Sequence, residues 1–220
     1  MPTKARDTFD ENAKDVERLL EIHADVGGDA KGRRFGLEVL NKSALVLITA
    51  IWEAYCEDVV SEALEHLVNN VPQASHLPKE LRKRITADIK SEPNDLAMWD
   101  LADGGWKSKA KARLTTLTAE RNRKLNTPKA EQIDELFAAG IGLSKLSDAW
   151  KWKKMSSTKA RQKLDDYVGV RGAIAHRGAA AAGIKKWQVT DHFQHVKRLV
   201  AQTDSRVAQH VKNSTGKSLW

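Results

Sequence analysis

Residues 44–60 of the chain read ALVLITAIWEAYCEDVV, with apolar side chains at the three- and four-residue spacing of one helix face. The spacing extends from about Phe35 to Asn70, and Pro72 would end a helix there. At about 1.5 Å per residue, such a helix would be roughly 50 Å long. We therefore predict a long central helix in a helical bundle, with Trp52 and Tyr55 in the core rather than on the surface.

The rest of the chain also shows helical periodicity, and strand-like alternation is nearly absent. The further predicted helices cover residues 10–26, 81–89, 106–124, 128–139, 157–177 and 190–211. Residues 71–105 are interpreted as a connection or a helical insertion, residues 1–8 as frayed and residues 213–220 as a loose tail. The prediction is a single all-α domain over residues 1–220.

Composition narrows the class of protein. Hydrophobic residues make up 41% of the chain and charged residues 30%, which is typical of a soluble globular protein. No apolar run approaches the ~20 residues of a membrane span, and the polar N-terminus does not resemble a signal peptide. We therefore expect a cytoplasmic protein with no membrane contact. Cys56 is the only cysteine, which excludes an intramolecular disulfide and a cysteine-rich metal site.

Charge is distributed unevenly around the net value of +8. Residues 1–106 hold 13 Lys or Arg against 20 Asp or Glu, whereas residues 151–220 hold 15 against 4. Residues 107–129 add 8 basic residues against 1 acid. Such an excess suits a phosphate-rich partner, because each neutralised phosphate releases counterions. A cationic face that is merely solvated is the alternative.

The segment YVGVRGAIAHRG, residues 167–178, holds the best candidates for chemistry. Arg171 is a permanent planar cation suited to a phosphate, and His176 titrates near neutrality and can transfer a proton. Positions five apart lie about 140° apart on an ideal helix, so spacing alone does not bring the two together. They could still be brought together by the long arginine side chain, by a helix end near Gly178 or by a second copy of the chain. Alternatively, His176 caps the helix and Arg171 forms a surface ion pair.

Two glycines interrupt the same helical pattern, Gly169 and Gly172. Each costs roughly 1 kcal/mol against alanine inside a helix. Their presence predicts either a close approach of another backbone or a local distortion that redirects side chains.

The phrase RGAIAHRG, with Arg-x4-His followed by Arg-Gly late in a helical chain, resembles the signature of HEPN-domain ribonucleases. Residues 44–60, an aliphatic run followed by Trp-Glu-x-Tyr and acids, resemble a helix of the RiboL-PSP-HEPN and related bacterial branches. The resemblance implies an all-α HEPN-like bundle that dimerises. One position departs from the family: the residue after the arginine is often polar, and here it is Gly172.

By this resemblance, the protein would be a metal-independent endoribonuclease that needs no cofactor. Arg171 and His176 from two protomers would share one basic cleft, where His176 assists attack of the ribose 2′-hydroxyl or protonates the leaving oxygen. Arg171 would bind the phosphate, and the products would carry 2′,3′-cyclic phosphate and 5′-hydroxyl ends. Family members commonly act as toxins or in antiphage defence, which implies an antitoxin or another defence-system protein as partner.

Cations beside aromatic residues are the candidates for RNA contact. They are Arg177, Lys185, Lys186, Lys153 and Lys154. Trp150 and Trp152 would either stack on unpaired bases or anchor this segment to the core. Glu53 is a candidate supporting acid that would pair with Arg171, or else a solvated helix glutamate.

Histidines on the last predicted helix offer a metal alternative. His192 and His195 have a spacing that metal ligands use, but no third ligand is evident, so we interpret them, like His23, as surface residues. Two other functions stay open from the residues alone. One is a catalytically inactive helical module that binds RNA or a partner protein. The other is a DNA-binding regulator, although no recognition-helix chemistry supports it.

Overall fold

The computed structural model describes residues 3–27, 36–124, 127–177 and 183–219, without the side chains of residues 114, 117–124 and 177. Within these ranges the α-helices are α1 (Lys4–Gly27), α2 (Glu38–Asn70), α3 (Lys79–Lys90), α4 (Gly105–Lys124), α5 (Ala130–Ile141), α6 (Ser157–Arg177) and α7 (Lys186–Thr215). Three short 3-10 helices accompany them there, η1 (Ala74–His76), η2 (Asp95–Gly104) and η3 (Leu146–Ala149). The predicted all-α fold with a long helix is confirmed.

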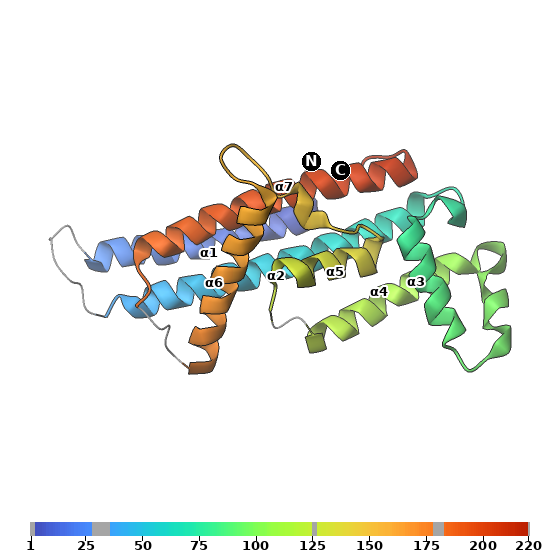
Figure 1. The fold of residues 1–220 in the computed structure, drawn as a ribbon, viewed down its shortest axis with the longest axis horizontal. Coiled ribbons are helices and arrows are strands. Elements are labelled where there is room, and N and C mark those ends of the chain that lie inside the picture. The colour runs from blue at the N-terminus through green and yellow to red at the C-terminus, as the bar shows by residue number, and fades with distance from the viewer. Residues whose placement is uncertain (1–2, 28–35, 125–126, 178–182, 220) are drawn as a thin grey trace.

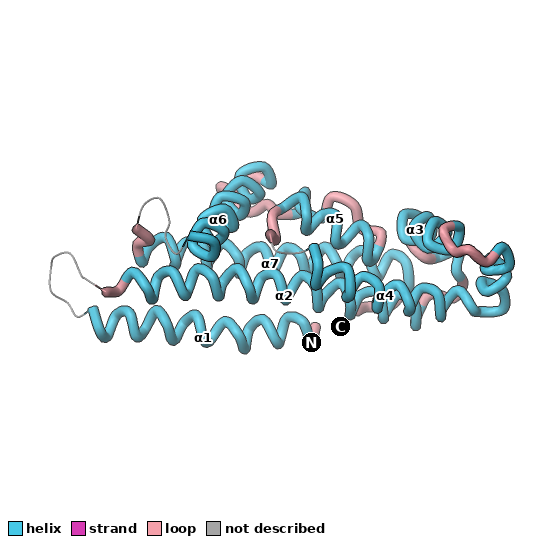
Figure 2. The backbone as a smooth tube through the Cα atoms, turned by 90° about the horizontal axis from the view of Figure 1, so that it is seen from below, coloured by secondary structure: helices cyan, strands magenta, loops and turns pink. Residues whose placement is uncertain are grey.

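The long helices α1, α2 and α7 lie side by side and form the body of the molecule (Figures 1 and 2). α1 runs opposite to the other two, while α5 packs on α2 and α6 crosses α2 steeply (Figure 1). The elements α3, η2 and the first turns of α4 form an arm beside the C-terminal end of α2 (Figure 1). Most of this arm is the segment predicted to be a connection or an insertion. No described helix is both long and apolar enough to cross a membrane.

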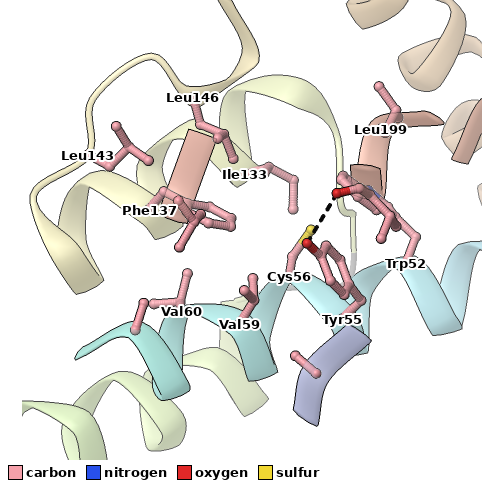
Figure 3. Close-up of a cluster of buried hydrophobic side chains, with 14 of the residues drawn as sticks. Trp52, Tyr55, Cys56, Val59, Val60, Ile133, Phe137, Leu143, Leu146 and Leu199 are labelled. Carbon is pink, nitrogen blue, oxygen red and sulfur yellow. Dashed lines mark hydrogen bonds between the residues drawn. The ribbon is translucent and has the colours of Figure 1, made fainter. Parts of the chain in front are cut away.

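The core is built around α2, because that helix carries apolar side chains on most of its circumference. Trp52 and Tyr55 are at most 1% exposed, as predicted. Figure 3 shows both beside apolar side chains of α5 and α7. Trp150 packs edge-to-face on Trp52, with ring centroids 5.7 Å apart, and its Nε1 donates to Thr203 Oγ1 at 3.0 Å. Trp150 is therefore a core anchor and offers no surface for stacking.

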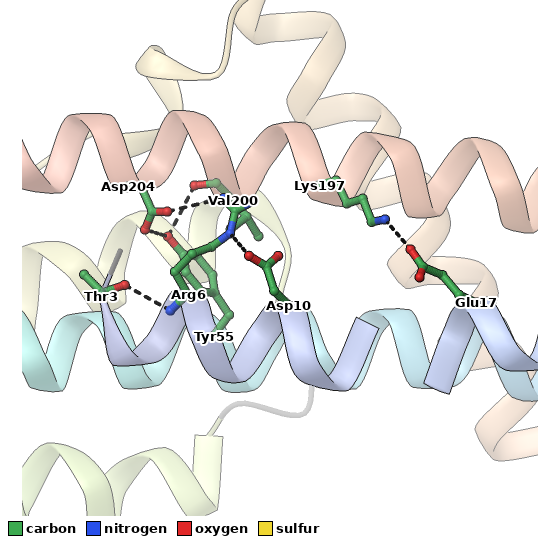
Figure 4. A network of polar contacts seen from close by, with 8 residues as sticks. All are labelled: Thr3, Arg6, Asp10, Glu17, Tyr55, Lys197, Val200 and Asp204. Atoms are coloured by element: carbon green, nitrogen blue, oxygen red, sulfur yellow. Dashed lines mark hydrogen bonds and ion pairs between the residues drawn. The ribbon is translucent and has the colours of Figure 1, made fainter. Parts of the chain in front are cut away.

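Residues 3–8 are packed, so the expectation of a frayed start over residues 1–8 is wrong for these residues, while residues 1–2 lie outside the described part of the chain. α1 begins at Lys4 and buries Phe9 against the ring of Tyr55. Arg6 donates to Asp10 at 2.9 Å and to Asp204 on α7 at 3.4 Å, and the Tyr55 hydroxyl donates to Asp204 as well (Figure 4). Burial raises the pKa of both Tyr55 and Asp204. This network ties α1 to α2 and α7.

The C-terminal residues are also ordered, which corrects the prediction of a loose tail over residues 213–219. α7 continues to Thr215, which is buried, and Gly216 ends the helix at φ +69°. The backbone N–H of Lys217 donates to Thr215 Oγ1 at 3.0 Å, and Leu219 packs against the core. The periodicity of α7 was visible to Val211, but the capping contacts beyond it are tertiary.

One glycine is required by a close approach. Gly142 follows α5 at φ +70°, and a Cβ there would lie 2.8 Å from Pro78 Cβ and 2.9 Å from the backbone nitrogen of Leu81. Only glycine combines this left-handed conformation with that contact without strain. The base of the arm is thus fixed against α5.

Candidate active site on the crossing helix

The sequence motif lies in α6, which is one continuous helix. Its buried face consists of Ala160, Leu164 and Val168, each at most 2% exposed and spaced four residues apart. The helix continues unbroken through Gly169 and Gly172, so the predicted local distortion does not occur. The buried face fixes the rotation of α6 and therefore the direction of every motif side chain.

Arg171 follows the side of α6 that faces the bundle. It is three residues after Val168 and seven after Leu164, and such positions share a helix face. The side chain is half-buried and its Nε is shielded from solvent. Arg171 also interacts with other groups of the chain. The guanidinium is thus held at the edge of the bundle rather than free in solvent.

His176 lies on a different side of the helix and is exposed. It is four residues after Gly172 and seven after Gly169, so these three share a face. Apart from adjacent residues and the neighbouring backbone of α6 itself, no described atom lies within 4 Å of the place where a Cβ would stand on either glycine. The close approach predicted for the glycines is therefore not made by any described part of this chain. The histidine stands at one end of a bare helix surface.

A polar clasp holds α6 one turn before the motif. Asp191 at the start of α7 accepts a hydrogen bond from the Tyr167 hydroxyl at 2.8 Å and one from Lys163 Nζ at 2.7 Å. Burial alone would raise the pKa of Asp191, but the hydrogen bonds from Lys163 and Tyr167 outweigh it and lower the pKa. Sequence reasoning missed this clasp. The spacing of Lys163, Tyr167 and Arg171 by four was its only signal.

Two histidines back the clasp, and the prediction that they are surface residues is wrong. His192 is 0% and His195 3% exposed. His192 stacks on Tyr167 with ring centroids 4.3 Å apart, and His195 Nε2 donates to the carbonyl oxygen of Ala160 at 3.0 Å. Burial lowers the pKa of His192 to about 3 and that of His195 to about 4. Both rings are therefore neutral packing elements at pH 7. His23, at 7% exposed, was also wrongly placed on the surface.

The N-terminal half of α6 has further anchors. Arg161 Nε donates to Ser147 Oγ at 2.6 Å, and its guanidinium also pairs with Asp148. Asp165 Oδ1 accepts from the backbone N–H of Ala130 at 2.8 Å and so caps the start of α5. These contacts join α6 to α5 and η3. Together with the clasp they fix the helix that presents the motif.

The predicted RNA-binding cations fall in separate places. Lys185 and Lys186 start α7, where Asn41 Nδ2 donates to Ile184 O at 2.8 Å and ties this start to α2. In Figure 1 the start of α7 and the end of α6 lie toward the same end of α2. Trp187, next to them, is 62% exposed. This basic and aromatic group therefore lies toward the same end of α2 as the motif.

Lys153 and Lys154 belong to the opposite end of α6. They are exposed in a tight turn closed by Trp152 and Met155, whose backbone N–H groups donate to each other's carbonyl oxygens at 3.1 and 2.9 Å. From Ser157, the first residue of α6, the helix rises about 30 Å to His176. These two lysines are not brought to the motif within one chain. The side chain of Arg177 lies outside the described residues.

Glu53 is half-buried on α2, the helix that α6 crosses, and it interacts with other groups of the chain. Its proposed pairing with Arg171 remains a prediction. Among the described residues, no three His, Cys, Asp or Glu side chains form a group that could hold a metal ion.

Some cations of the basic segment over residues 107–124 form ion pairs within the arm. Lys109 Nζ pairs with Glu92 at 3.0 Å and with Asp100 at 3.2 Å, and Arg113 pairs with Asp88. Lys109 and Arg113, two cations of this basic segment, therefore hold α4 to α3 and η2. The cations at positions 121, 123 and 124 lie outside the described side chains.

An all-α bundle crossed by a helix with Arg-x4-His is consistent with one class of protein, the HEPN domain. A family model described as RiboL-PSP-HEPN matches residues 10–209 of the chain. The match covers most of its length, and the chain therefore belongs to the RiboL-PSP-HEPN family. HEPN domains are generally ribonucleases, which gives a nuclease as the coarse functional class. No curated protein and no solved structure matches the chain.

Proposed function

We propose that the protein is a metal-independent endoribonuclease whose active site forms between two copies of the chain. His176 would accept the proton of a ribose 2′-hydroxyl, whose oxygen attacks the adjacent phosphorus. The bond from phosphorus to the 5′-oxygen then breaks, and that oxygen takes up a proton. The products are a 2′,3′-cyclic phosphate and a 5′-hydroxyl. Arg171 would hold the phosphate and stabilise the charge that develops on it.

The observation that carries this proposal is the separation of the two motif residues around α6. Arg171 follows the bundle-facing side, whereas His176 shares a bare face with Gly169 and Gly172. A face without side chains lets another helix approach closely. A second copy of α6 on that face would bring two histidines and two arginines into one site. This arrangement supports a homodimer as the active species.

Charge and exposed aromatic surface support RNA as the substrate. Residues 151–220 carry 15 Lys or Arg against 4 Asp or Glu. Lys185, Lys186 and the exposed Trp187 start α7 on the side of the motif. Basic side chains that follow a backbone, with an aromatic ring for base stacking, are typical of single-strand binding. Arg177 would add a cation at the end of α6.

In biological terms, we propose a toxin or an antiphage-defence effector that acts on RNA. Uncontrolled cleavage of RNA would arrest growth, so such a protein would need a partner that restrains it, for example an antitoxin or another defence-system protein. The exposed end of α6 is where a restraining protein would act, because covering His176 there blocks the site without unfolding the bundle.

The test is incubation of the purified protein with a mixed RNA pool in EDTA, beside His176→Ala and Arg171→Ala. We expect cyclic-phosphate fragments from the wild type, and at least about 100-fold slower cleavage by His176→Ala, the lower end of what a general acid–base contributes. Lys159→Ala, an exposed change at the other end of α6, is the matched control and should cleave normally. Equal cleavage by all variants would refute the motif assignment.

A second candidate is a catalytically inactive module that binds RNA or a partner protein. Gly172 favours it, because the family often has a polar residue after the motif arginine and glycine provides no polar group. If the wild type leaves RNA intact but binds it, and Arg171→Ala weakens that binding, this candidate replaces the nuclease.

A further inference from the structure

A strongly cationic surface outside the motif belongs to α3 in the arm. Its sequence, KELRKRITADIK, holds five Lys or Arg and two acids. The helix buries Leu81, Ile85 and Ile89 against the core, which fixes its rotation. Its outer face is therefore as firmly oriented as its inner face. This surface lies within the N-terminal part of the chain, whose overall charge is negative.

The outer cations form a continuous row, which we call the α3 ridge. It consists of Lys79, Arg82, Lys83, Thr86 and Lys90. Their spacings of three and four place them on one face of the helix, over about 16 Å of its length. With Ala87 they line a shallow depression of about 480 Å³. All four cations are exposed.

The ridge keeps its charge. Among the described residues, Lys79, Arg82 and Lys90 take part in no ion pair, and Lys83 pairs with Glu80 in an exposed contact of 2.9 Å. Asp88, the other acid of α3, pairs with Arg113 of α4 instead. Two of the described cations of α4 differ, since Lys109 pairs with Glu92 and Arg113 with Asp88 within the arm. The ridge thus presents exposed cations, most of them unpaired among the described residues, to an external anion.

We propose that the α3 ridge binds the phosphate backbone of single-stranded RNA at a second contact, distant from the motif. That the polyanion is RNA rests on the proposed function, whereas the ridge itself rests on the contacts above. α3 lies at the C-terminal end of α2 and the motif nearer its start (Figure 1). One RNA strand that reaches both would have to run along the bundle. The ridge would then favour long RNA over short fragments.

The experiment measures binding in a His176→Ala background, so that the probe stays intact. A fluorescent 30-nucleotide single-stranded RNA of mixed sequence is titrated by anisotropy at several salt concentrations. The test variant adds Lys79→Gln, Arg82→Gln and Lys90→Gln, which keep good helix formers on an exposed face. The control adds Lys14→Gln, Arg18→Gln and Lys212→Gln, which remove the same charge from exposed sites on α1 and α7.

The ridge variant should bind RNA about 10- to 100-fold more weakly near 100 mM salt. Its plot of log K against log salt should be less steep by about 2, because each lost contact to a single strand contributes roughly 0.7 to the steepness. The control should change by less than half of that. Equal slopes for the two variants would overturn the proposal. The proposal would also be overturned if poly-L-glutamate of matched charge competed as well as unlabelled RNA. The ridge would then bind an acidic protein rather than RNA.

Binding and cleavage separate the two proposals. If the wild type cuts RNA but the ridge variant keeps the full salt slope, the α3 ridge is refuted and the nuclease stands. If the slope falls by about 2 but the wild type cuts nothing, the ridge stands and the nuclease is refuted. Thermal melting of the variants checks that all three proteins are folded.

Discussion

The two halves of α6 have opposite surroundings. The N-terminal half buries Ala160, Leu164 and Val168 and is held by the clasp of Lys163 and Tyr167 on Asp191. The C-terminal half begins at Gly169 and leaves a bare face with His176 exposed at its end. One helix therefore combines a fixed base with a surface that nothing described in this chain covers.

This contrast between the two halves of α6 fits the catalytic role proposed for the motif. A catalytic group must be positioned to within a fraction of an ångström, and an exposed helix end alone does not provide that. The packed half of α6 supplies the rigidity, and the bare half supplies access. Changes in the first half should therefore affect stability, whereas changes in the second half should affect assembly and chemistry.

The largest effect is expected for Gly172→Trp, a change in the C-terminal half of α6. Within the single chain a Cβ at this position meets nothing beyond its own helix, and the side chain would start from a face that no described residue covers, so we expect the fold to persist. A close helix partner would be pushed away, and a displacement of about an ångström can already cost roughly 100-fold in rate. We expect loss of the proposed dimer in sedimentation analysis and at least about 100-fold slower cleavage in the proposed RNA assay.

The matched change is Lys159→Trp, which places the same side chain on an exposed position of the packed half. It should leave mass and cleavage unchanged. A Gly172→Trp protein that remains dimeric and active would show that the bare face is not the dimer interface.

The next effect is acid sensitivity of the packed half. The pKa values of His192 and His195, about 3 and about 4, lie below their ordinary value of 6.5 because burial disfavours the charged ring. The folded state then binds fewer protons than the unfolded state, so stability is full above about pH 6.5 and falls as the pH drops toward 4. At pH 5 each histidine should cost roughly 2 kcal/mol of unfolding free energy.

His192→Phe keeps a ring against Tyr167 but cannot be protonated. Neither ring nitrogen of His192 has a hydrogen-bond partner among the described residues, so the change should cost little at pH 7. In urea unfolding, the stability difference between pH 7 and pH 5 should shrink by roughly 2 kcal/mol relative to the wild type. His76→Phe, on an exposed histidine, is the control. An unchanged difference would contradict the buried, neutral state of His192.

The smallest expected effect comes from Tyr167→Phe. It removes the hydroxyl that donates to Asp191 at 2.8 Å but keeps the ring that stacks on His192. Loss of one hydrogen bond to a charged, half-buried group should lower the unfolding free energy by about 1–2 kcal/mol. The cleavage rate measured well below the melting temperature should stay near that of the wild type. A large rate loss without a stability loss would place Tyr167 in the chemistry instead.

Periodicity was a good guide where a helix buries one consistent face. The long helix predicted over residues 35–70 is α2, Glu38–Asn70, and its Trp52 and Tyr55 are core residues as predicted. The prediction was wrong for His192 and His195, because their polar residue type was given more weight than their position on the helix. His192 and His195 lie four residues before Val196 and Leu199, so the spacing of α7 already placed them on its buried face.

The motif was recognisable in the sequence, but its geometry was not. Spacing places Arg171 and His176 about 140° apart without saying which of them faces the protein. The packing of Leu164 and Val168 decides that Arg171 follows the bundle and His176 the open side. The same holds for the cations: Lys109 is paired across the arm with Glu92, and Lys153 lies at the far end of α6 from His176.

Most of the helices, the family motif and the basic half could be predicted from the sequence alone, because they depend on local periodicity, residue identity and summed charge. Which face of each helix is buried and which cations stay unpaired could not, because burial and pairing depend on contacts between residues far apart in the chain. For that reason the Arg171–His176 motif was visible from the sequence. The bare glycine face beside His176 and the exposed row of cations on the α3 ridge became visible only in the folded protein.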